Sequence, residues 1–331
     1  MPPKKQTTSS LVSALSFVVK AQQQAGTPIQ THCCIKNQQI TAFNGMISVG
    51  HSIEEDLNVC PHTYSFLNAM QKCGPEYSIT QQNGKLTVKS GKFTCQIPCL
   101  PDDLTPSVTD ASCASISDDL LKSLGQVSSL AQEAAQKVIL SSVLIKDFSC
   151  FATTGYVIKQ SFHGINLPVI ALPKLFVTAL CSTDKKVVGF GFSEAKVNNV
   201  LTPNSATFYF EDGSWLKTQL YAEQWPDLNR MLACEIEPSS LPEGFFEAVR
   251  NVEDFSVGKK DKKVWLSQNG VSSHKDQTEG AFYEMKGLPE IAFKIEQLKQ
   301  VEDCCDKVVF NDGKLYAFKD KVRAIVMGVK G

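Results

Sequence analysis

The sequence near the carboxyl end, residues 308–327, has the pattern of a β-hairpin. It reads VVFNDGKLYAFKDKVRAIVM, with Asp312-Gly313 between two runs in which apolar residues alternate. A two-residue Asp-Gly loop favours a tight turn with both residues at positive φ, and this turn fixes how the flanking strands pair. The sequence therefore predicts two antiparallel strands that meet at this turn.

An earlier stretch of the chain repeats this hairpin without a gap. Residues 83–97 read NGKLTVKSGKFTCQI. The Gly-Lys-Leu at 84–86 matches the one at 313–315. The alignment continues to Ile97, which falls on Val326. A repeat constrains the fold more strongly than a single motif, because both copies must belong to the same kind of structural unit.

Helix and strand signals run along the chain in three rounds of helix, strands, helix, strands. Each round is roughly a third of the chain, which is long enough to carry its own core. The sequence therefore predicts an α+β fold of three repeated domains, each with two helices packed on antiparallel sheets. The expected domains are 1–108, 112–232 and 234–331, and the proline-containing stretch 98–117 is the expected linker.

The expected elements follow from apolar spacing and from turn and cap residues. Helices are expected at residues 11–19, 61–73, 118–130, 173–180, 245–252 and 291–301. Strands are expected at residues 33–40, 47–53, 77–79, 86–88, 93–97, 138–145, 148–158, 187–192, 206–210, 215–221 and 264–266, before the final hairpin. Pro61 and Pro173 are expected in the first turn of their helices, where proline is favoured.

The composition is that of a globular protein. Of 331 residues, 43% are hydrophobic and 20% are charged, and the net charge is −1. This balance shows no overall commitment to nucleic acid, so any DNA-binding cations must gather on one surface. No stretch approaches the ~20 apolar residues of a membrane span, so no membrane partner is expected.

The twelve cysteines mostly occupy apolar positions of the pattern. Free cysteine behaves as a small buried hydrophobe, which predicts a reduced, cytoplasmic protein. The best zinc-ligand candidates are the groups His32/Cys33/Cys34 and Cys60/His62. Their spacing does not match the strict patterns of zinc sites, so no metal is expected.

Three short motifs lie in order along this repeat. Residues 152–157 read ATTGYV, residues 220–232 read LYAEQWPDLNRML and residues 324–327 read AIVM. Together with the threefold repeat, they give the chain a resemblance, over essentially its whole length, to the bacterial-type DNA polymerase III β sliding clamp. In that family the corresponding motifs are an Ala-Thr-Asp-Gly turn, a Phe-Pro-Asp-Tyr run and a Val-Met-Pro-Met tail. The divergence suggests a phage- or plasmid-encoded clamp.

The resemblance implies a DNA replication processivity factor and not an enzyme. Two protomers would join head to tail into a six-domain ring, a homodimer that encircles double-stranded DNA without reading its sequence. The polymerase and the clamp loader would be tethered through short peptides with a Gln and Leu or Phe anchors. No catalytic residue, cofactor or metal is implied.

The resemblance also implies an apolar peptide groove between the second and third domains. The matching positions are Leu140, Thr153, Gly155, Tyr156, Val157, Ile158, Pro226, Arg230, Met231, Val326, Met327 and Val329. Aliphatic and Met side chains with one Arg suit pockets that peptide anchors fill. A plain core role is the alternative for Leu140, Val157, Ile158 and Met231. Tyr156-Val157 stands where basic residues are common and the tail lacks the family's proline, so we expect an altered peptide preference.

Sliding requires a sequence-independent electrostatic surface without side chains that read base edges. Cations on the helices that face the ring's hole would supply it, and the candidates are Lys20, Lys72, Lys122, Lys137, Lys174, Arg250, Lys294 and Lys299. Ordinary solvated helix charges are the alternative reading of each. Lys4-Lys5 and the loop 259–263 are further candidates for phosphate contacts. Acidic residues on the same helices are Asp118, Asp119, Glu243, Glu247, Glu253 and Glu296.

Two other function classes remain open at this stage. The chain has none of the usual nucleotide-binding, serine-hydrolase or zinc-protease motifs. A Cys/His thiol enzyme would have to use His163 with Cys150, or Cys60 with His62, and neither pair has an evident third group. The other alternative is a clamp-like decoy that binds partner peptides without encircling DNA.

Overall fold

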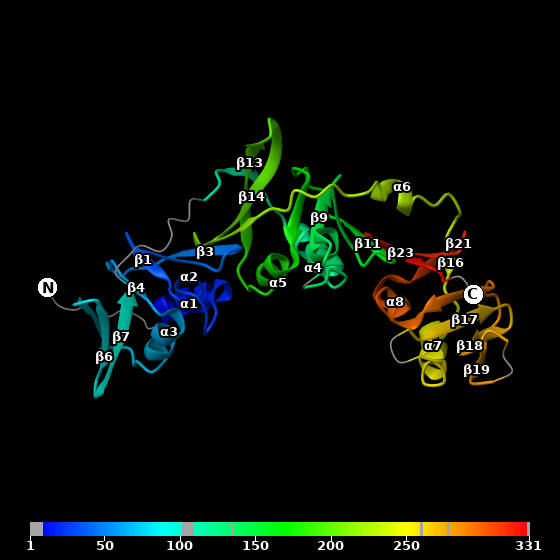
Figure 1. Cartoon of the computed structure of the whole chain (residues 1–331), viewed down its shortest axis with the longest axis horizontal. Helices are drawn as coiled ribbons and strands as arrows, with labels where there is room; N and C mark the ends of the chain where they lie inside the picture. The colour runs from blue at the N-terminus through cyan, green and yellow to red at the C-terminus, as the bar shows by residue number, and fades with distance from the viewer. Residues whose placement is uncertain (1–8, 101–108, 134, 259–260, 277–278, 330–331) are drawn as a thin grey trace. The chain divides into compact units, whose positions relative to one another are not determined.

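The computed structural model describes residues 9–100, 109–133, 135–258, 261–276 and 279–329 (Figure 1). The chain forms two compact units, residues 1–118 with 178–222, and residues 119–177 with 223–331. Each unit contains antiparallel sheets and helices, so the predicted α+β class is confirmed. No helix in these ranges is long and apolar enough to cross a membrane.

The first unit is built on a seven-stranded antiparallel sheet. Its strands, in spatial order, are β1 (Cys34–Lys36), β2 (Gln39–Phe43), β3 (Ile47–Ser52), β15 (Trp215–Gln219), β14 (Val200–Phe210), β13 (Val187–Val197) and β8 (Ser112–Ser115). Strands β3 and β15 join distant segments through the pair Gly50–Trp215. A Cβ atom at Gly50 would lie 2.2 Å from the Trp215 ring, so this pairing requires glycine.

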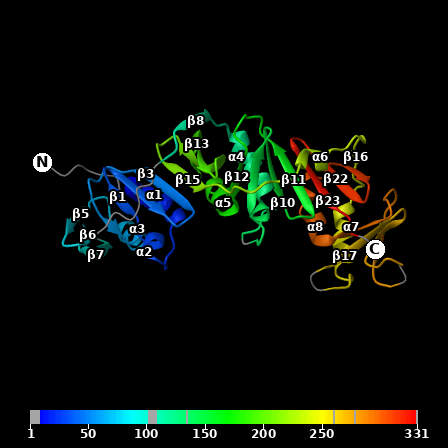
Figure 2. The same cartoon turned by 45° about the horizontal axis from the view of Figure 1, so that its top comes forward.

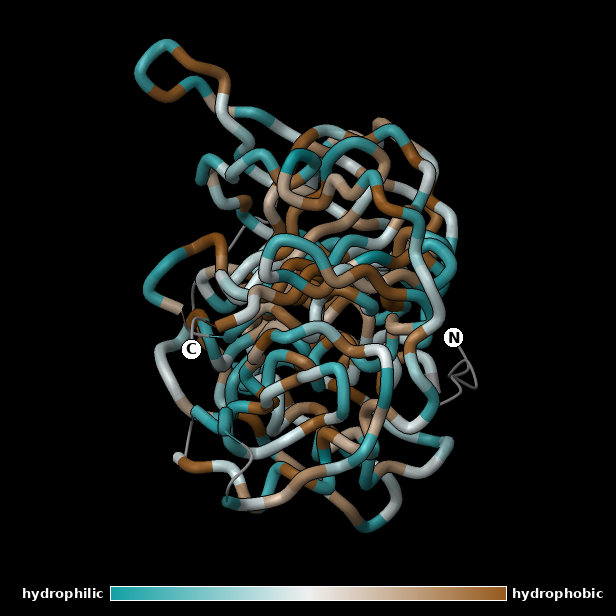
Figure 3. Tube along the Cα trace, turned by 90° about the vertical axis from the view of Figure 1, so that its right-hand side faces the viewer, coloured by the Kyte–Doolittle hydropathy of each residue, from teal (hydrophilic) through white to brown (hydrophobic). Residues whose placement is uncertain are grey.

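The hairpin of β13 and β14 extends beyond its neighbours in this sheet (Figures 1 and 3). Strand β15 pairs with β14 only from Ser205 to Tyr209, so the far end of the hairpin is a two-stranded ribbon. Its tip carries the exposed apolar residues Val197, Val200 and Leu201.

The rest of the first unit includes a four-stranded sheet and short helices. The sheet has the order β4 (Cys60–Pro61), β7 (Phe93–Leu100), β6 (Lys85–Ser90) and β5 (Ser78–Gln82). The helices are α1 (Ser9–Val18), the 3-10 turn η1 (Val19–Ala21), α2 (Pro28–Thr31) and α3 (Thr63–Gln71). Helix α1 packs on α3 and β3, because its Leu11, Leu15 and Val18 are buried on one side.

The second unit is built on an eight-stranded antiparallel sheet (Figure 2). Its order is β12 (Ile170–Pro173), β9 (Ser142–Lys146), β10 (Ser149–Thr153), β11 (Val157–Phe162), β23 (Val322–Met327), β22 (Lys314–Lys319), β21 (Lys307–Asn311) and β16 (Ser239–Ser240). A four-stranded sheet has the order β19 (Phe282–Glu284), β18 (Gly270–Ser272), β17 (Lys263–Ser267) and β20 (Ile291–Lys294). The helices are α4 (Asp118–Ser128), η2 (Val138–Ser141), α6 (Leu228–Leu232), α7 (Phe245–Glu253), α8 (Ile295–Lys299) and η3 (Glu302–Cys304). Helix α5 (Lys174–Cys181) begins in this unit, and its last four residues belong to the first.

The two copies of the predicted hairpin have the same structure. Leu86 pairs with Ile97 between β6 and β7, and Leu315 pairs with Val326 between β22 and β23. The turn before each copy has two residues at positive φ, at 83–84 and at 312–313. The gapless alignment therefore matched residues that occupy equivalent positions in the two copies. Residues 308–327 form three strands and not the two expected, because a second turn at Asp320 and Lys321 follows the one at Asp312-Gly313. The three domain boundaries themselves stay a prediction.

Several expected elements differ from the structure. Two prolines were expected in the first turns of helices, and one apolar run was expected to be a helix. Pro61 and Pro173 are the last residues of β4 and β12, and the helices begin after them. The expected helix 291–301 is strand β20 followed by the short helix α8. A short apolar run fits either a helix or a strand. Backbone pairing of β20 with β17 makes the first part of this segment a strand.

Other boundaries changed at turns. The expected strand 33–40 is two strands joined by a turn at Asn37 and Gln38, both at positive φ. The expected strand 138–145 begins as the 3-10 turn η2. In the expected linker 98–117, Pro98 belongs to β7 and residues 112–115 form β8, whereas Pro101 and Pro106 lie outside the described residues.

Two glycines of the second unit give opposite expectations for replacement by alanine. Gly313 has a φ of 68°, so Gly313→Ala should lower the free energy of unfolding by about 1–2 kcal/mol. Gly125 lies in α4, and a Cβ atom added there would have no neighbour within 4 Å. Gly125→Ala should therefore raise the free energy of unfolding by about 0.5–1 kcal/mol. Chemical denaturation of both variants measures the signs, and a neutral Gly313→Ala would contradict the turn assignment.

Candidate functional site

The turn at residues 153–157 is fixed by its own threonine side chains. Thr153 Oγ1 donates to the carbonyl of Val157 at 2.8 Å and accepts from the N–H of Gly155 at 3.0 Å. Thr154 Oγ1 accepts from the N–H of Val157 at 3.1 Å. Gly155 has a φ of 89°, which glycine adopts without strain. The turn presents Tyr156 to solvent, with 55% of its surface exposed.

Strand β11 leaves this turn and pairs with β23, the last strand of the chain. Val157 pairs with Val326 and Ile158 with Ile325, and the N–H of Met327 donates to the carbonyl of Tyr156 at 2.9 Å. Successive side chains of a strand point to opposite faces of the sheet. The face that carries Ile158 and Ile325 therefore also carries Tyr156 and Met327.

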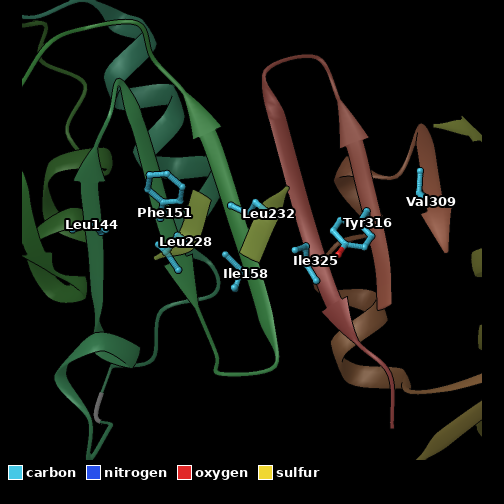
Figure 4. Close-up of a cluster of buried hydrophobic side chains, with 8 residues drawn as sticks. All are labelled: Leu144, Phe151, Ile158, Leu228, Leu232, Val309, Tyr316 and Ile325. Atoms are coloured by element: carbon cyan, nitrogen blue, oxygen red, sulfur yellow. The ribbon is translucent and has the colours of Figure 1, made fainter. Parts of the chain in front are cut away.

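Helix α6 covers part of that face. Its Leu228 and Leu232 are buried in a cluster with side chains from the sheet (Figure 4). The other members of the cluster are Leu144, Phe151, Ile158, Val309, Tyr316 and Ile325. Asp227 caps the helix, because its Oδ1 accepts from the N–H of Arg230 at 3.2 Å. The buried leucines leave Met231 on the outer side of α6, with 43% of its surface exposed.

Two adjoining cavities open beside this cluster. The first has a volume of about 200 Å³ and is lined by Gly155, Tyr156, Ile158, Met231, Lys314, Ile325 and Met327. The second has a volume of about 630 Å³ and is lined by Gln132, Ala135, Gln136, Lys137, Leu140, Thr154, Gly155 and Tyr156. Because Gly155 and Tyr156 line both, the cavities form one groove with an apolar end and a polar end. We call it the Tyr156 groove.

Tyr156 is flanked by an ion pair. Lys294 Nζ lies 5.4 Å from the centre of the Tyr156 ring and 2.6 Å from Asp261 Oδ1. The hydrogen bond from Lys294 to Asp261 raises the pKa of the lysine. Lys294 is therefore a charged partner for the ring face at neutral pH.

The predicted groove residues do not all lie in this groove. Gly155, Tyr156, Ile158, Met231 and Met327 line its apolar end, and Leu140 lines its polar end. The others lie elsewhere. Thr153 is buried in the turn, and Val157 and Val326 are buried on the opposite face of the sheet. Pro226 and Arg230 are exposed outside both linings, and Val329 lines a separate cavity with Trp265. Strand alternation explains why the two valines lie on the opposite face, and a role of the predicted residues in peptide binding stays a prediction.

At the apolar end of the groove, sequence reasoning missed two lining residues, Ile325 and Lys314. At the polar end it missed Gln132, Ala135, Gln136 and Thr154, and it had assigned Lys137 to DNA. Ile325 lies two positions before Met327, so the same alternation places it on the groove face. Lys314 pairs with Met327 between β22 and β23, and that register follows from the two-residue turn at Asp320 and Lys321. Both signals were present in the sequence.

The predicted DNA-contacting cations have varied surroundings. Carboxylates hold Arg250, Lys294 and Lys299, which pair with Glu302 at 2.7 Å, Asp261 at 2.6 Å and Glu253 at 2.5 Å. Lys20 donates to the carbonyl of Ser182 at 3.0 Å, and burial lowers its pKa. Lys174 donates to the carbonyl of Ser128. Lys72, just after α3, and Lys122, on α4, are exposed.

Three of these cations lie outside the helices, contrary to the prediction. Lys72 is the residue that follows the end of α3. Lys137 precedes the 3-10 turn η2 and lines the Tyr156 groove. Lys294 ends strand β20. Lys4-Lys5 and the first two lysines of the loop 259–263 lie outside the described residues. DNA contact by the remaining cations stays a prediction.

The described residues give little support to the thiol-enzyme and zinc alternatives. Cys150 and His163 are both buried, and burial lowers the pKa of His163. His32 and His62 meet edge to face with ring centres 5.3 Å apart. Within the part of the chain described above, however, no three His, Cys, Asp or Glu side chains are placed to hold a metal ion.

Comparison with known proteins identifies the fold. No protein-family model and no curated protein matches this sequence. The DNA polymerase sliding clamp of Pseudomonas aeruginosa superposes with a TM-score of 0.78 at 16% identity, covering 98% of both chains. The Helicobacter pylori beta clamp bound to a DNA ligase peptide has a TM-score of 0.72 at 14% identity, covering 98% of this chain and 99% of that chain. The chain therefore has the fold of bacterial sliding clamps over its whole length.

The threonine hydroxyls should determine how firmly the turn holds Tyr156. Thr153→Val keeps the shape of the side chain but leaves the N–H of Gly155 without its acceptor. We expect amide hydrogen exchange at residues 155–157 to accelerate by about tenfold, corresponding to ~1.4 kcal/mol. Thr154→Ser retains its hydroxyl and is the control. Equal exchange in Thr153→Val and the unmodified protein would contradict the proposed role.

Proposed function

We propose that this protein is a DNA sliding clamp, a processivity factor that encircles duplex DNA and tethers a polymerase to it. The observation that carries the proposal is the full-length likeness to bacterial clamps, with 98% of this chain covered. The Tyr156 groove supplies independent support, because a clamp needs a site that captures partners. No catalysis is part of the proposal, and the site of action is the cytoplasm, where bacterial DNA is replicated.

The Tyr156 groove is the proposed partner site. Its apolar end is a pocket walled by Ile158, Ile325 and the two methionines Met231 and Met327. Flexible thioether side chains adapt to different apolar anchors, which suits a site that serves several partners. We infer that short peptides from the polymerase and the clamp loader place a Leu or Phe there, with a Gln at the polar end. A DNA ligase peptide is bound to the Helicobacter pylori clamp.

The proposed assembly is a head-to-tail homodimer, a six-domain ring. Strands β5 and β19 each have a single neighbour in their four-stranded sheets. Unpaired strands at a sheet edge favour pairing with another chain, and a head-to-tail contact closes into a ring when its rotation permits. Each protomer would then contribute three of the six domains.

Peptide affinity should depend on the two methionines of the groove. In Met231→Ala with Met327→Ala, the apolar wall loses both side chains, and we expect binding of a fluorescent Gln/Leu/Phe peptide to weaken by more than about tenfold. Val329→Ala is the matched control, because Val329 lines a different cavity. Fluorescence anisotropy measures both. Equal loss in the control, or no loss in the double variant, would remove the groove assignment.

Retention on DNA should depend on topology. A closed ring slides off the ends of linear DNA but stays on a nicked circle, so we expect the protein, once loaded, to co-elute only with the circle. Cutting the circle should release it. Light scattering during size exclusion supplies the control, with twice the chain mass expected. A monomer that binds peptide and is retained on neither DNA would favour the clamp-like decoy.

A further inference from the structure

A further cavity lies on the four-stranded sheet of the second unit. It has a volume of about 440 Å³, and Trp265, Ala292 and Val329 belong to its lining. Trp265 of β17 pairs with Ala292 of β20, and the N–H of Val329 donates to the carbonyl of Ala292 at 2.8 Å. The described residues of this lining include none that line the Tyr156 groove. Small-molecule sites have volumes of this size, so this cavity, which we call the Trp265 cavity, has room for one small ligand.

One side of the Trp265 cavity offers an aromatic ring and a cation. Trp265 is partly exposed. The exposed Lys275 places its Nζ 5.7 Å from the centre of the ring, near the outer limit of a cation–π contact. A planar group that stacks on the ring takes the place of this loosely held ammonium. The flexible lysine stem then keeps the charge beside the ligand, where it attracts an anion.

The other side of the cavity offers hydrogen-bond acceptors. Glu290 comes two residues before Ala292, and Ser267 two residues after Trp265, so strand alternation puts all four on one face of the sheet. Strands β17 and β20 are antiparallel, which brings Ser267 and Glu290 to the same end, and both line the cavity. Two residues of a strand span about 6.6 Å. Glu290 therefore lies one row along the face from the aromatic ring, beside the stacking position and not on it.

We propose that the Trp265 cavity binds a nucleotide whose base carries an exocyclic amine. The base stacks on Trp265, as bases do on the aromatic side chains of proteins that bind single strands. The amine donates a hydrogen bond to the Glu290 carboxylate, the contact by which carboxylates recognise cytosine. Lys275 binds the phosphate through its ammonium group. The inference goes beyond the proposed function, because it concerns neither the peptide groove nor the duplex inside a ring.

A nucleotide fits the cavity better than a peptide. An amino-bearing base and its phosphate carry a planar ring, an N–H donor and an anion on one compact frame, and the cavity presents a partner for each. A peptide needs more than one residue to supply the same three groups, because a phenylalanine ring has neither the donor nor the anion. A free mononucleotide and one nucleotide of a single strand share this chemistry.

The first test compares two pyrimidine nucleotides by isothermal titration calorimetry. Cytosine presents an amine where thymine presents a carbonyl oxygen, so this position of dCMP can donate to Glu290 and that of dTMP cannot. We expect the unmodified protein to bind dCMP about fivefold more tightly than dTMP, a modest preference because Glu290 is exposed. Glu290→Gln should remove it, because an amide serves as donor or acceptor. Glu284→Gln is the matched control, since Glu284 is exposed on β19 of the same sheet and lies outside the lining.

Further variants separate the stacking ring from the cation. Trp265→Leu removes the stacking surface and should weaken dCMP binding by more than about tenfold. Lys275→Met keeps the stem but removes the charge, so it should weaken dCMP binding about fivefold and leave binding of deoxycytidine, which has no phosphate, unchanged. Lys286→Met, at an exposed position outside the lining, is the control. The circular dichroism spectrum of each variant checks that the sheets are intact.

An octamer of deoxycytidylate identifies the source of the nucleotide. Tighter binding of the octamer than of dCMP, lost in Trp265→Leu, would identify a single strand as the ligand, whereas equal binding of both would identify the free nucleotide. Failure of both to bind, or equal binding of dCMP and dTMP, would overturn the inference. Octamer binding that survives Trp265→Leu would also overturn it and would point to the predicted DNA-facing cations. Displacement of dCMP by the Gln/Leu/Phe peptide would show that the cavity takes peptide instead.

Discussion

The antiparallel pairing of β11 with β23 is the interaction on which the groove depends. It joins residues far apart in the chain, through the pairs Val157–Val326 and Ile158–Ile325, into one continuous sheet. Each strand alone would expose apolar side chains to water. Together they form an apolar surface that buries Leu228 and Leu232 of α6. The apolar end of the groove is the part of this surface that α6 leaves open.

On the opposite face of β11, polar side chains hold neighbouring elements against the sheet. Lys159, next to Ile158 on β11, is 1% exposed and donates to both carboxylate oxygens of Asp303 at 2.7 Å. Ser161 donates to Gln126 Oε1 of α4 at 2.7 Å. Removing one partner of a buried charge leaves the other uncompensated, which is costly. These contacts therefore hold α4 and η3 against the sheet, on the face opposite the groove.

Local rules predicted the hairpins, and they failed where tertiary pairing decides. The Asp-Gly turn at 312–313 was predicted correctly, but the pairing of Leu315 with Val326 is fixed by a second two-residue turn at Asp320 and Lys321. Segment 291–301 was predicted as helix, because nothing local reveals that β17 pairs with its first half. In the candidate site, motif matching returned contiguous positions such as Tyr156, Val157 and Ile158, whereas a strand presents only alternate ones. The place of Met231 was not accessible from local pattern, since it depends on how α6 docks.

The ion pairs of the predicted DNA-facing cations bear on how a clamp of this kind would hold DNA. A phosphate must displace Glu302 from Arg250 and Glu253 from Lys299 before either cation can neutralise a charge on the duplex. Such exchange gains little free energy, because both partners of an exposed pair are well solvated. Intrinsic affinity for DNA would then be low and nearly uniform along the duplex. Low affinity favours sliding but not retention. In the proposed ring, retention would therefore come from ring closure, and the strength of the protomer contacts would set the residence time on DNA.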